Sequence, residues 1–456
     1  MIILIKITVK DLLENTDSKL LIGDESLEIN ECFVDSRKVK EGSCFFGVEG
    51  KKENGSVYYK EAFLNGASIV VINKMNSIDL DMYKDKTIVL TNNVLKVLHD
   101  IAIFKRSLFK GKVIGITGSV GKTTTRKILV SILKNKYKVL TNNGNENGQL
   151  GVPLTILRLK DEDVIALEMG VSMKGEMNKL SKIARPNISL ITNICESHIA
   201  NFNSKEDILN AKLEIINGMD KGTLYLNNDD SLLNNLKIYD KNINTITYGI
   251  KNESDYMVNN LLIDNDINFD FCMINDIKLN VPYSYIYNFL GPILISKEFN
   301  ISNDDIYKGI YNYKNEHHRL EIINLDNNIT MIDDTYNANL KSVKASIEFI
   351  SKYDKRKIFV LGDILELGKI SKKTHQQIGY LLKNSNIDIL ITIGKYSKYT
   401  GKKCKNIWNK HFYNEKDSRE YIKKLLKEDD VILLKGSNGM NLVNIVDDLK
   451  KYFIFQ

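Results

Sequence analysis

The stretch Val113-Ile-Gly-Ile-Thr-Gly-Ser-Val-Gly-Lys-Thr-Thr-Thr125 decides the fold of this chain. An apolar run leads into a glycine-bearing turn, and a helical pattern follows from Thr125 to Leu133. Backbone N–H groups and the positive start of a helix can surround phosphate oxygens, and glycine lets the backbone approach them closely. We expect Lys122 to meet the terminal phosphates and the Thr123 hydroxyl to bind Mg²⁺. The stretch predicts a nucleotide-phosphate loop.

The loop does not follow the generic phosphate-loop pattern at one position. That pattern would have glycine at position 116, where this chain has Ile116, so a chance Gly-Lys-Thr turn is the alternative interpretation. The strand and helix patterns on either side favour the phosphate loop. GTPases, kinases and motor ATPases all share such a loop, so it does not by itself define a reaction.

Outward from the loop, alternating strand and helix patterns predict an α/β fold with a parallel sheet. A chain of 456 residues exceeds what one hydrophobic core usually serves, and we expect three domains. These are an N-terminal α/β domain over 1–95, a central P-loop parallel-sheet ATPase domain over 96–315, and a C-terminal Rossmann-like α/β domain over 316–456. Two local expectations are a first strand at Met1–Lys6 and a short antiparallel sheet over about 223–282.

The C-terminal domain is predicted from a second alternating series. Its strand candidates are Thr330–Asp333, Ile358–Leu361, Ile389–Ile393 and Val431–Leu434.

Composition excludes several classes of protein. With 43% hydrophobic and 27% charged residues, the chain is typical of globular proteins. Five scattered cysteines without a C-x-x-C pair argue against a disulfide framework and a structural zinc site, and fit a reducing compartment. The apolar opening is too short for a signal or a membrane span, so we expect a cytoplasmic protein without a membrane partner. The formal charge of +7 is interpreted as single lysines spread along the chain, which disfavours a nucleic-acid partner.

The loop form Thr117-Gly-Ser-Val-Gly-Lys-Thr-Thr124 is similar to the T-G-x-x-G-K-T-T of the Mur ligases. Two N-terminal segments, Val34-Asp-Ser-Arg-Lys-Val39 and Gly42-Ser-Cys-Phe-Phe46, resemble the family's uridine-nucleotide domain. Further segments resemble family motifs in family order: Asn145-Glu-Asn-Gly-Gln-Leu-Gly-Val-Pro-Leu-Thr155, Glu168-Met-Gly170, Thr192-Asn-Ile-Cys-Glu-Ser-His198, Ala211-Lys-Leu-Glu214, Arg319-Leu-Glu321, Asp333-Asp-Thr-Tyr-Asn-Ala-Asn339, Leu361-Gly-Asp-Ile-Leu-Glu-Leu-Gly368 and Leu434-Lys-Gly-Ser437. The resemblance covers nearly the whole chain.

The resemblance implies an ATP-dependent amide ligase that activates a carboxylate as an acyl phosphate. The D-D-x-Y-N-A-N and G-D-x-L-E-L-G motifs are most similar to members that join D-alanyl-D-alanine to UDP-N-acetylmuramoyl-tripeptide. Such a member uses ATP and two Mg²⁺ ions, binds both small-molecule substrates, and acts as a monomer. It also carries a lysine carboxylated by CO₂, which the Ala211-Lys212-x-Glu214 match places at Lys212.

Site roles carry over onto the matching positions. The implied catalytic residues are Lys122, Lys212, His198 and Arg319. The implied nucleotide-binding residues are Gly118, Ser119, Gly121, Lys122, Thr123, Thr124, Asn288, Arg319, Asp334 and Asn337. The implied substrate-binding residues are Ser36, Arg37, Asn145, Asn147, Tyr336, Asn339 and Lys435. The implied metal-binding residues are Thr123, Glu168, His198 and Lys212.

Taken singly, several of these residues have a plain structural interpretation. A lone histidine after a strand is more often a hydrogen-bonding residue than a ligand, and a lone lysine on a helix is normally solvated. Asn337 and Asn339 could simply form an asparagine-rich turn. Thr123 and Glu168, by contrast, offer oxygen atoms that suit a hard Mg²⁺ ion.

The chain departs from the family pattern at positions that read substrates. These departures are Asn54-Gly-Ser56, Pro282-Tyr-Ser-Tyr-Ile-Tyr-Asn288, Asn337-Ala-Asn-Leu340 and Gly436-Ser-Asn-Gly-Met440. In the last, asparagine replaces an arginine whose bidentate fork it cannot reproduce. A paralogue with another amine or acceptor is therefore an alternative. The third stem residue, lysine or diaminopimelate, stays open.

Other classes fit less well. The diaminopimelate-adding members carry a D-N-P-R motif that this chain lacks, and folylpolyglutamate synthase lacks the Asp35-Ser-Arg37 type of domain. A non-catalytic nucleotide-binding protein would have no need to keep Lys122, Glu168, His198, Lys212 and Arg319 together. A nucleic-acid ATPase would want a basic groove bearing aromatic residues.

Overall fold

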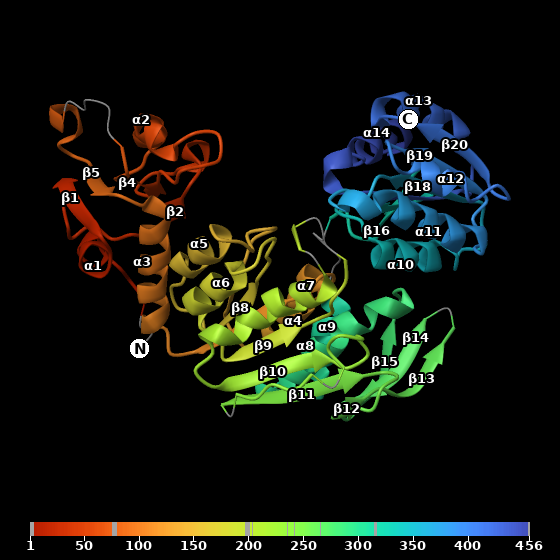
Figure 1. Cartoon of the computed structure of the whole chain (residues 1–456), viewed down its shortest axis with the longest axis horizontal. Coiled ribbons are helices and arrows are strands. Elements are labelled where there is room, and N and C mark those ends of the chain that lie inside the picture. The colour runs from red at the N-terminus through yellow and green to blue at the C-terminus, as the bar shows by residue number, and fades with distance from the viewer. Residues whose placement is uncertain are drawn as a thin grey trace.

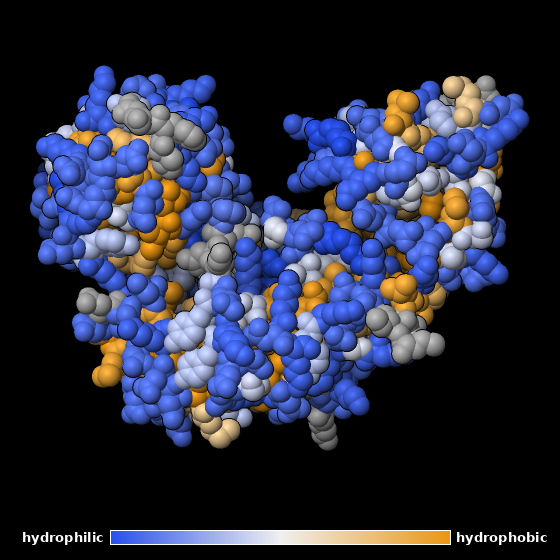
Figure 2. Space-filling view, turned by 180° about the vertical axis from the view of Figure 1, so that it is seen from behind, coloured by the Kyte–Doolittle hydropathy of each residue, from blue (hydrophilic) through white to orange (hydrophobic). Residues whose placement is uncertain are grey.

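The structure is a computed structural model that describes residues 4–74, 80–196, 201–202, 204–234, 236–240, 242–264, 266–313 and 317–454. Three α/β domains follow one another, with the N-terminal and C-terminal domains standing at opposite ends of the central one (Figure 1). A hollow separates these two end domains above the central domain (Figure 2). Within the described ranges, every helix falls short of the length and apolarity that a bilayer crossing requires.

The N-terminal domain has a five-stranded sheet in the order β1-β5-β4-β3-β2. Only β1 is antiparallel to its neighbour. The strands are β1 (Ser18–Ile22), β2 (Cys32–Phe33), β3 (Cys44–Phe46), β4 (Ile69–Ile72) and β5 (Thr87–Thr91), and the helices are α1 (Val9–Asn15), α2 (Tyr59–Leu64) and α3 (Val94–Leu108).

The first strand expected at Met1–Lys6 is wrong for its described part, Leu4–Lys6, and Met1–Ile3 lie outside the described residues. The backbone N–H of Ile5 donates to the carbonyl of Lys160 in the central domain (2.9 Å). Helix α1 then begins directly after Thr8, whose hydroxyl accepts from the backbone N–H of Asp11 (3.3 Å). The apolar opening therefore leads from a contact with the central domain into a capped helix.

The central domain has a seven-stranded sheet in the order β12-β11-β10-β9-β6-β8-β7, and all of its pairings are parallel. Its strands are β6 (Lys112–Thr117), β7 (Val139–Thr141), β8 (Val164–Glu168), β9 (Ile188–Ile191), β10 (Gly222–Asn227), β11 (Ile243–Gly249) and β12 (Tyr256–Met257). Its helices are α4 (Lys122–Leu133), α5 (Gly151–Leu157), α6 (Glu176–Ala184), α7 (Lys205–Leu213), α8 (Tyr287–Glu298) and α9 (Asn303–Asn312).

The antiparallel sheet expected over about 223–282 is correct only for the second half of that stretch. There β13 (Asn259–Ile263), β14 (Ile267–Phe271) and β15 (Ile274–Leu279) form a three-stranded antiparallel sheet. The first half instead extends the parallel sheet, because successive β10 residues such as Leu224 and Tyr225 are buried on both faces.

The C-terminal domain has a six-stranded sheet in the order β16-β17-β21-β18-β19-β20, parallel except for β16. The four predicted strands are confirmed as β17 (Thr330–Asp334), β18 (Lys357–Gly362), β19 (Ile389–Ile393) and β21 (Val431–Lys435). The remaining elements are β16 (Glu321–Asn324), β20 (Trp408–Phe412), α10 (Leu340–Ile350), α11 (Ser371–Lys383), α12 (Lys398–Gly401), α13 (Glu415–Leu425) and α14 (Val443–Ile454).

The central and C-terminal sheets both turn the carboxyl ends of their strands toward one cavity. Residues of the loop after β6, at the end of β8 and at the ends of β17 and β21 line it. In open α/β sheets ligands bind at the carboxyl ends of strands. The fold thus places the candidate site between two domains.

Candidate active site

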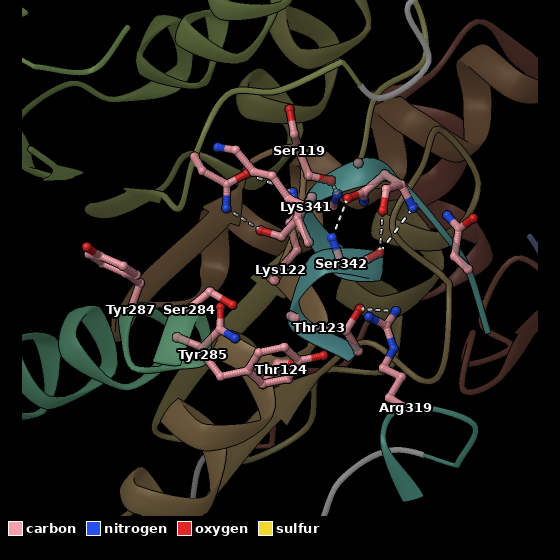
Figure 3. Close-up of a pocket in the computed structure, with 18 of the residues that line it drawn as sticks. Ser119, Lys122, Thr123, Thr124, Ser284, Tyr285, Tyr287, Arg319, Lys341 and Ser342 are labelled. Carbon is pink, nitrogen blue, oxygen red and sulfur yellow. Dashed lines mark hydrogen bonds between the residues drawn. The ribbon is translucent and has the colours of Figure 1, made fainter. Parts of the chain in front are cut away.

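The cavity between the central and C-terminal domains has a volume of about 650 Å³. Its central-domain wall contains the phosphate loop, Glu168, Lys212 and the start of α8, and its opposite wall contains Arg319, Asp334 and helix α10. Figure 3 shows Arg319 reaching toward the start of α4 from one side, with Tyr285 and Tyr287 on the other. A cavity of this size holds a nucleotide-sized ligand.

The phosphate loop is a tight turn that only glycine can form at two positions. Gly118 has φ +143° and Gly121 has φ +85°. A Cβ atom at Gly118 would lie 1.9 Å from Thr192 Oγ1, and one at Gly121 would lie 2.3 Å from Asn288 Oδ1. The loop therefore packs directly on the segment after β9 and on helix α8.

Side chains outside the loop fix its shape. The Asn193 amide accepts from Val120 N (3.1 Å) and donates to Val120 O (2.9 Å). The Ser119 hydroxyl accepts from Cys195 N (2.9 Å), and Thr192 Oγ1 donates to Val120 O (2.7 Å). These bonds hold the loop backbone in place before any ligand binds.

Lys122 and Thr123 open helix α4 at the floor of the cavity. The Lys122 amine donates to the carbonyl of Gly118 (2.8 Å), and burial lowers its pKa. The Thr123 hydroxyl accepts from Arg319 Nη2 (3.1 Å), a contact between the two domains (Figure 3). A cation, a hydroxyl and a helix start that meet in this way form a site for a multiply charged anion.

Glu168 lies at the end of β8, next to β6, and is 3% exposed. Its Oε1 accepts from the Asn147 amide (2.7 Å), and Arg126 Nε lies 3.7 Å from Oε2. Oε2 is buried and has no hydrogen-bond partner within the part of the chain that the structure describes. A buried carboxylate oxygen without a donor is costly, and carboxylate and hydroxyl oxygens are ligands that Mg²⁺ prefers. The Glu168 and Thr123 oxygens therefore fit a Mg²⁺ ion.

Lys212 lies near the end of α7 and is 4% exposed. Burial, with a smaller contribution from the positive charge of Lys122, lowers the pKa of its amine to about 7. Near neutral pH a large share of this amine is uncharged and nucleophilic. His198, the remaining predicted metal ligand, lies outside the described residues.

Arg319 is held by the C-terminal domain. Its guanidinium lies over the Tyr336 ring, 4.0 Å from the centroid, and its Nε is buried without a hydrogen-bond partner among the described residues. The backbone beside it is fixed, since Tyr336 N donates to His318 O (3.0 Å) and His318 Nδ1 bonds Asp333 Oδ2 (2.6 Å).

The ligand-type atoms of His318, Glu321 and Asp333 all lie within 4.8 Å of one another. Because a direct hydrogen bond already joins two of them, this cluster acts as a scaffold for Arg319.

Asp334 and Lys435, at the ends of β17 and β21, form a buried ion pair (2.6 Å). Asp334 Oδ2 also accepts from Ser346 Oγ (2.6 Å), and the Lys435 amine donates to Asn337 O (3.0 Å). Burial lowers the pKa of Lys435, and the Asp334 charge opposes that effect. Both residues line the cavity, but their opposite charges neutralise each other within the C-terminal domain.

The predicted asparagines occupy different environments. Asn147 and Asn288 line the cavity, as do Asn337 and Asn339, whereas Asn145 is exposed and is not among the lining residues. Asn339 is the N-cap of α10, and its Oδ1 accepts from Ser342 N (2.9 Å).

Ser36 and Arg37 lie in the N-terminal domain and do not line this cavity. The Ser36 hydroxyl, which is buried, donates to Glu61 (2.5 Å). Arg37 is exposed and forms a bidentate pair with Asp35 (2.8 and 2.9 Å). The structure therefore brings the predicted residues of the phosphate loop and of the C-terminal domain together in one cavity. Ser36 and Arg37, predicted to bind the uridine nucleotide, lie outside it.

The sequence interpretation missed several residues of the cavity. Lys341 Nζ on α10 lies 3.5 Å from the buried carboxylate of Asp230, three residues after the end of β10, so this pair is a second contact between the domains. Tyr283, Tyr285 and Tyr287, from the segment 282–288 that departs from the family pattern, also line the cavity, at alternate positions. A parallel β10 would have pointed to Asp230, because it would place that residue at the carboxyl edge of the sheet.

Comparisons with known proteins agree with this geometry. Residues 116–294 match the Mur ligase middle domain, and residues 318–438 match the "Mur ligase, glutamate ligase domain". The UDP-N-acetylmuramoyl-tripeptide--D-alanyl-D-alanine ligase of Bacillus subtilis (strain 168) is 32% identical over 98% of this chain and 99% of its own length.

Solved structures share the fold. MurF from Acinetobacter baumannii superposes with a TM-score of 0.87 at 24% identity, over 98% of this chain and 99% of that one. The MurF ligase of Thermotoga maritima in complex with ADP gives a TM-score of 0.78 at 26% identity, over 92% of this chain and 97% of that one.

Proposed function

The chain belongs to the Mur ligase family, and from that premise we propose that it is a MurF-type ligase. It joins D-alanyl-D-alanine to UDP-N-acetylmuramoyl-tripeptide at the expense of ATP, the reaction that the name of its Bacillus subtilis relative describes. The observation that carries the proposal is the contact of Arg319 with Thr123 at the phosphate loop, inside a cavity shared by two domains.

The reaction needs a leaving group on the stem-peptide carboxylate. A carboxylate oxygen attacks the γ-phosphorus of ATP, which forms an acyl phosphate and releases ADP. The amine of D-alanyl-D-alanine then attacks the acyl carbon, and the tetrahedral intermediate expels inorganic phosphate. Negative charge builds on phosphoryl and carbonyl oxygens in both steps, so the site must place positive groups around them.

Lys122 and Arg319 supply these positive groups. Lys122, at the start of α4, pairs with the terminal phosphates together with the loop N–H groups of Gly118, Ser119 and Gly121. Arg319, held flat on Tyr336, directs its guanidinium to the transferred phosphoryl group. Thr124 and Asn288 complete the nucleotide site beside the loop.

Mg²⁺ fits the oxygen atoms of Thr123 and Glu168, and the ion supplies charge neutralisation for the phosphates. The Thermotoga maritima relative is an ADP complex, which supports nucleotide use here. We assign Lys212 as the carboxylated lysine, because an uncharged, buried amine is the form that adds CO₂ to give a carbamate. With His198, that carbamate offers ligands for a second ion.

Substrate contacts follow from the walls of the cavity. Asn147, Tyr336, Asn339 and Lys435 line it, and Asp334 and Asn337 lie on the same wall. We place the uridine nucleotide at Ser36 and Arg37 and the exposed Asn145 near the stem peptide. The enzyme works as a cytoplasmic monomer. Its domains divide near 95 and 315, and the ranges of the four sheets, 18–91, 112–257, 259–279 and 321–435, are compatible with that division, although helix α3 begins at Val94.

The test is ADP release with UDP-N-acetylmuramoyl-tripeptide and ATP–Mg²⁺, with and without D-alanyl-D-alanine, alongside mass detection of the product. We expect turnover that depends on the dipeptide and yields the pentapeptide. Lysine- and diaminopimelate-containing tripeptides are compared in parallel to define the third stem residue. ATP binding that depends on Lys122, but without pentapeptide, would instead identify a paralogue with another amine or acceptor.

A further inference from the structure

One segment of the C-terminal domain is strongly basic. Residues 367–414 contain ten lysines, no arginine and one acidic residue, Asp388. The whole chain has 64 basic and 57 acidic residues, so the remainder has 54 and 56 and is slightly negative. The interpretation of the charge as dispersed is therefore wrong. Residues 101–145 form a second basic segment, with ten basic and no acidic residues.

The lysines of this segment are largely exposed. They are Lys369, Lys372, Lys373, Lys383, Lys395, Lys398, Lys402, Lys403, Lys405 and Lys410; eight are exposed and two are half-buried. None forms an ion pair with a carboxylate of the described residues. Asp388, the one acid of the segment, lies 3.9 Å from the Lys357 amine and accepts from its backbone N–H.

Helices α11 and α12 pack against each other (Figure 1). The Tyr399 ring has three amines near its centroid: Lys372 at 5.3 Å, Lys398 at 5.5 Å and Lys402 at 5.8 Å. Lys403 lies 5.2 Å from the ring of Tyr380. Like charges gathered this closely repel one another, and an external anionic partner relieves that repulsion.

This basic face, defined by Lys372, Lys398, Lys402, Lys403 and Tyr399, lies apart from the active-site cavity. The residues that line the cavity include none between 349 and 434. The face therefore does not serve the substrates that bind in the cavity, and a partner covering it leaves those lining residues free.

We propose that the basic face docks the protein on the surface of an anionic phospholipid bilayer. Lysine is a hydrated point charge on a flexible stem and suits a diffuse sheet of charge, whereas nucleic-acid recognition favours the arginine fork that this segment lacks. Tyrosine sits well at the level of lipid headgroups, and Tyr380 and Tyr413 are 52% and 69% exposed.

Docking by this face is peripheral and reversible. The exposed large side chains of the segment are Tyr380, Trp408 and Tyr413, with no exposed leucine, isoleucine, phenylalanine or methionine among its described residues. Attachment therefore depends on charge, and salt releases it. This departs from the expectation of no membrane partner, and it does not depend on the identity of the ligase reaction.

The test measures sedimentation of the full chain with vesicles at low ionic strength. Vesicles of equal phosphatidylcholine and phosphatidylglycerol are compared with pure phosphatidylcholine. We expect binding to the anionic vesicles only, and release at about 1 M salt, where the screening length falls to about 3 Å.

The variant Lys372→Glu/Lys398→Glu/Lys402→Glu should lose at least about a hundredfold in partition coefficient, since each lysine contributes about fivefold at an anionic surface. A matched control, Lys110→Glu/Lys134→Glu/Lys221→Glu, changes the same net charge at exposed positions of the central domain and should keep most of the binding. Unchanged ADP release with free substrates shows that the face variant is folded.

Three results overturn the proposal. The first is that the wild-type chain does not bind anionic vesicles at low salt. The second is that the face variant and the control variant lose binding equally. In the third, an oligonucleotide at the same phosphate concentration displaces the vesicles and binds through the same lysines, which makes the partner a nucleic acid.

Discussion

The phosphate-transfer core and the substrate-reading edges differ in how their polar atoms are used. In the core, Glu168 Oε2 and Arg319 Nε are buried without hydrogen-bond partners among the described residues. At the edges, Ser36 bonds Glu61, and Asn339 caps helix α10. Leaving a buried polar atom without a partner costs stability, and both residues line the cavity, where a bound ligand can supply one. Edge residues instead combine a structural bond with any contact to substrate.

The largest effect is expected at Lys122. We predict that Lys122→Met lowers ADP release by about a thousandfold, because the terminal phosphates lose their cation. Thermal stability should be unchanged or higher, since burial lowers the pKa of this amine and a methionine removes a buried cation. Turnover and the unfolding midpoint are measured together. Lys134→Met, at the exposed end of α4, is the control, and a variant that keeps a tenth of wild-type turnover contradicts the assigned role.

Arg319 sharpens the comparison, because it joins the two sides of the cavity. Arg319→Ala should lower kcat by about a hundredfold with little change in the KM for ATP, since the guanidinium acts on the phosphoryl group in transfer. Arg319→Lys should recover only part of that loss, because an ammonium lacks the planar fork that lies on Tyr336. Steady-state kinetics separates the two constants. A raised KM with unchanged kcat would make Arg319 a ground-state nucleotide ligand.

Lys212 gives a prediction about pH. With a pKa of about 7, its amine is mostly protonated at pH 6 and mostly neutral at pH 8. After CO₂ removal, the rate of reactivation at fixed dissolved CO₂ should rise about tenfold from pH 6 to pH 8 and then level off. An ordinary lysine pKa would give about a hundredfold rise over the same interval without levelling. Lys212→Ala should show no reactivation, so recovery in that variant excludes the assignment.

The same pKa fixes the sign of a stability effect. Between about pH 7 and the ordinary lysine pKa, the unfolded chain binds the proton that folded Lys212 lacks. If the amine is not carboxylated, stability therefore rises with pH across this window and is constant below it. Lys212→Met removes that rise. Urea unfolding of the CO₂-depleted wild-type and Lys212→Met proteins at several pH values measures how the free energy of unfolding changes with pH in each.

Sequence patterns predicted the elements whose signals are local. The strand, turn and helix around Gly118–Gly121 are encoded by residues next to one another, as are the buried β18 and β21. The segment 223–282 was misjudged because polar residues along β10 and β11 resemble an exposed antiparallel edge. Which strands become neighbours is decided by packing with α8. The Asp230–Lys341 contact could not be predicted from local patterns either, because its two residues are far apart in the sequence and meet only in the folded chain.

The lysine cluster in 367–414, by contrast, can be counted directly in the sequence. The small net charge of the whole chain, +7, conceals it because acidic residues elsewhere offset the lysines.

The smallest effect is expected at Asn339, where the two roles of an edge residue can be separated. Its Oδ1 accepts from Ser342 N, and its backbone N–H donates to Ser342 Oγ (2.9 and 3.0 Å). Asn339→Ala should lower the free energy of unfolding by about 1 kcal/mol through loss of the cap, whereas Asn339→Ser should keep most of it. Urea unfolding measures this difference.

Turnover then decides what else the Asn339 amide does. If the cap is its main role, Asn339→Ser keeps turnover within a few-fold of wild type, because serine fills the same backbone bond. If the amide also reads a substrate, Asn339→Ser keeps stability but raises the KM for the tripeptide or the dipeptide, since a hydroxyl cannot reproduce an amide's paired donor and acceptor. That second result would show that Asn339 takes part in substrate recognition even though its Oδ1 already accepts a hydrogen bond from Ser342 N. Core and edge residues would then differ only in whether their buried polar atoms lack a hydrogen-bond partner.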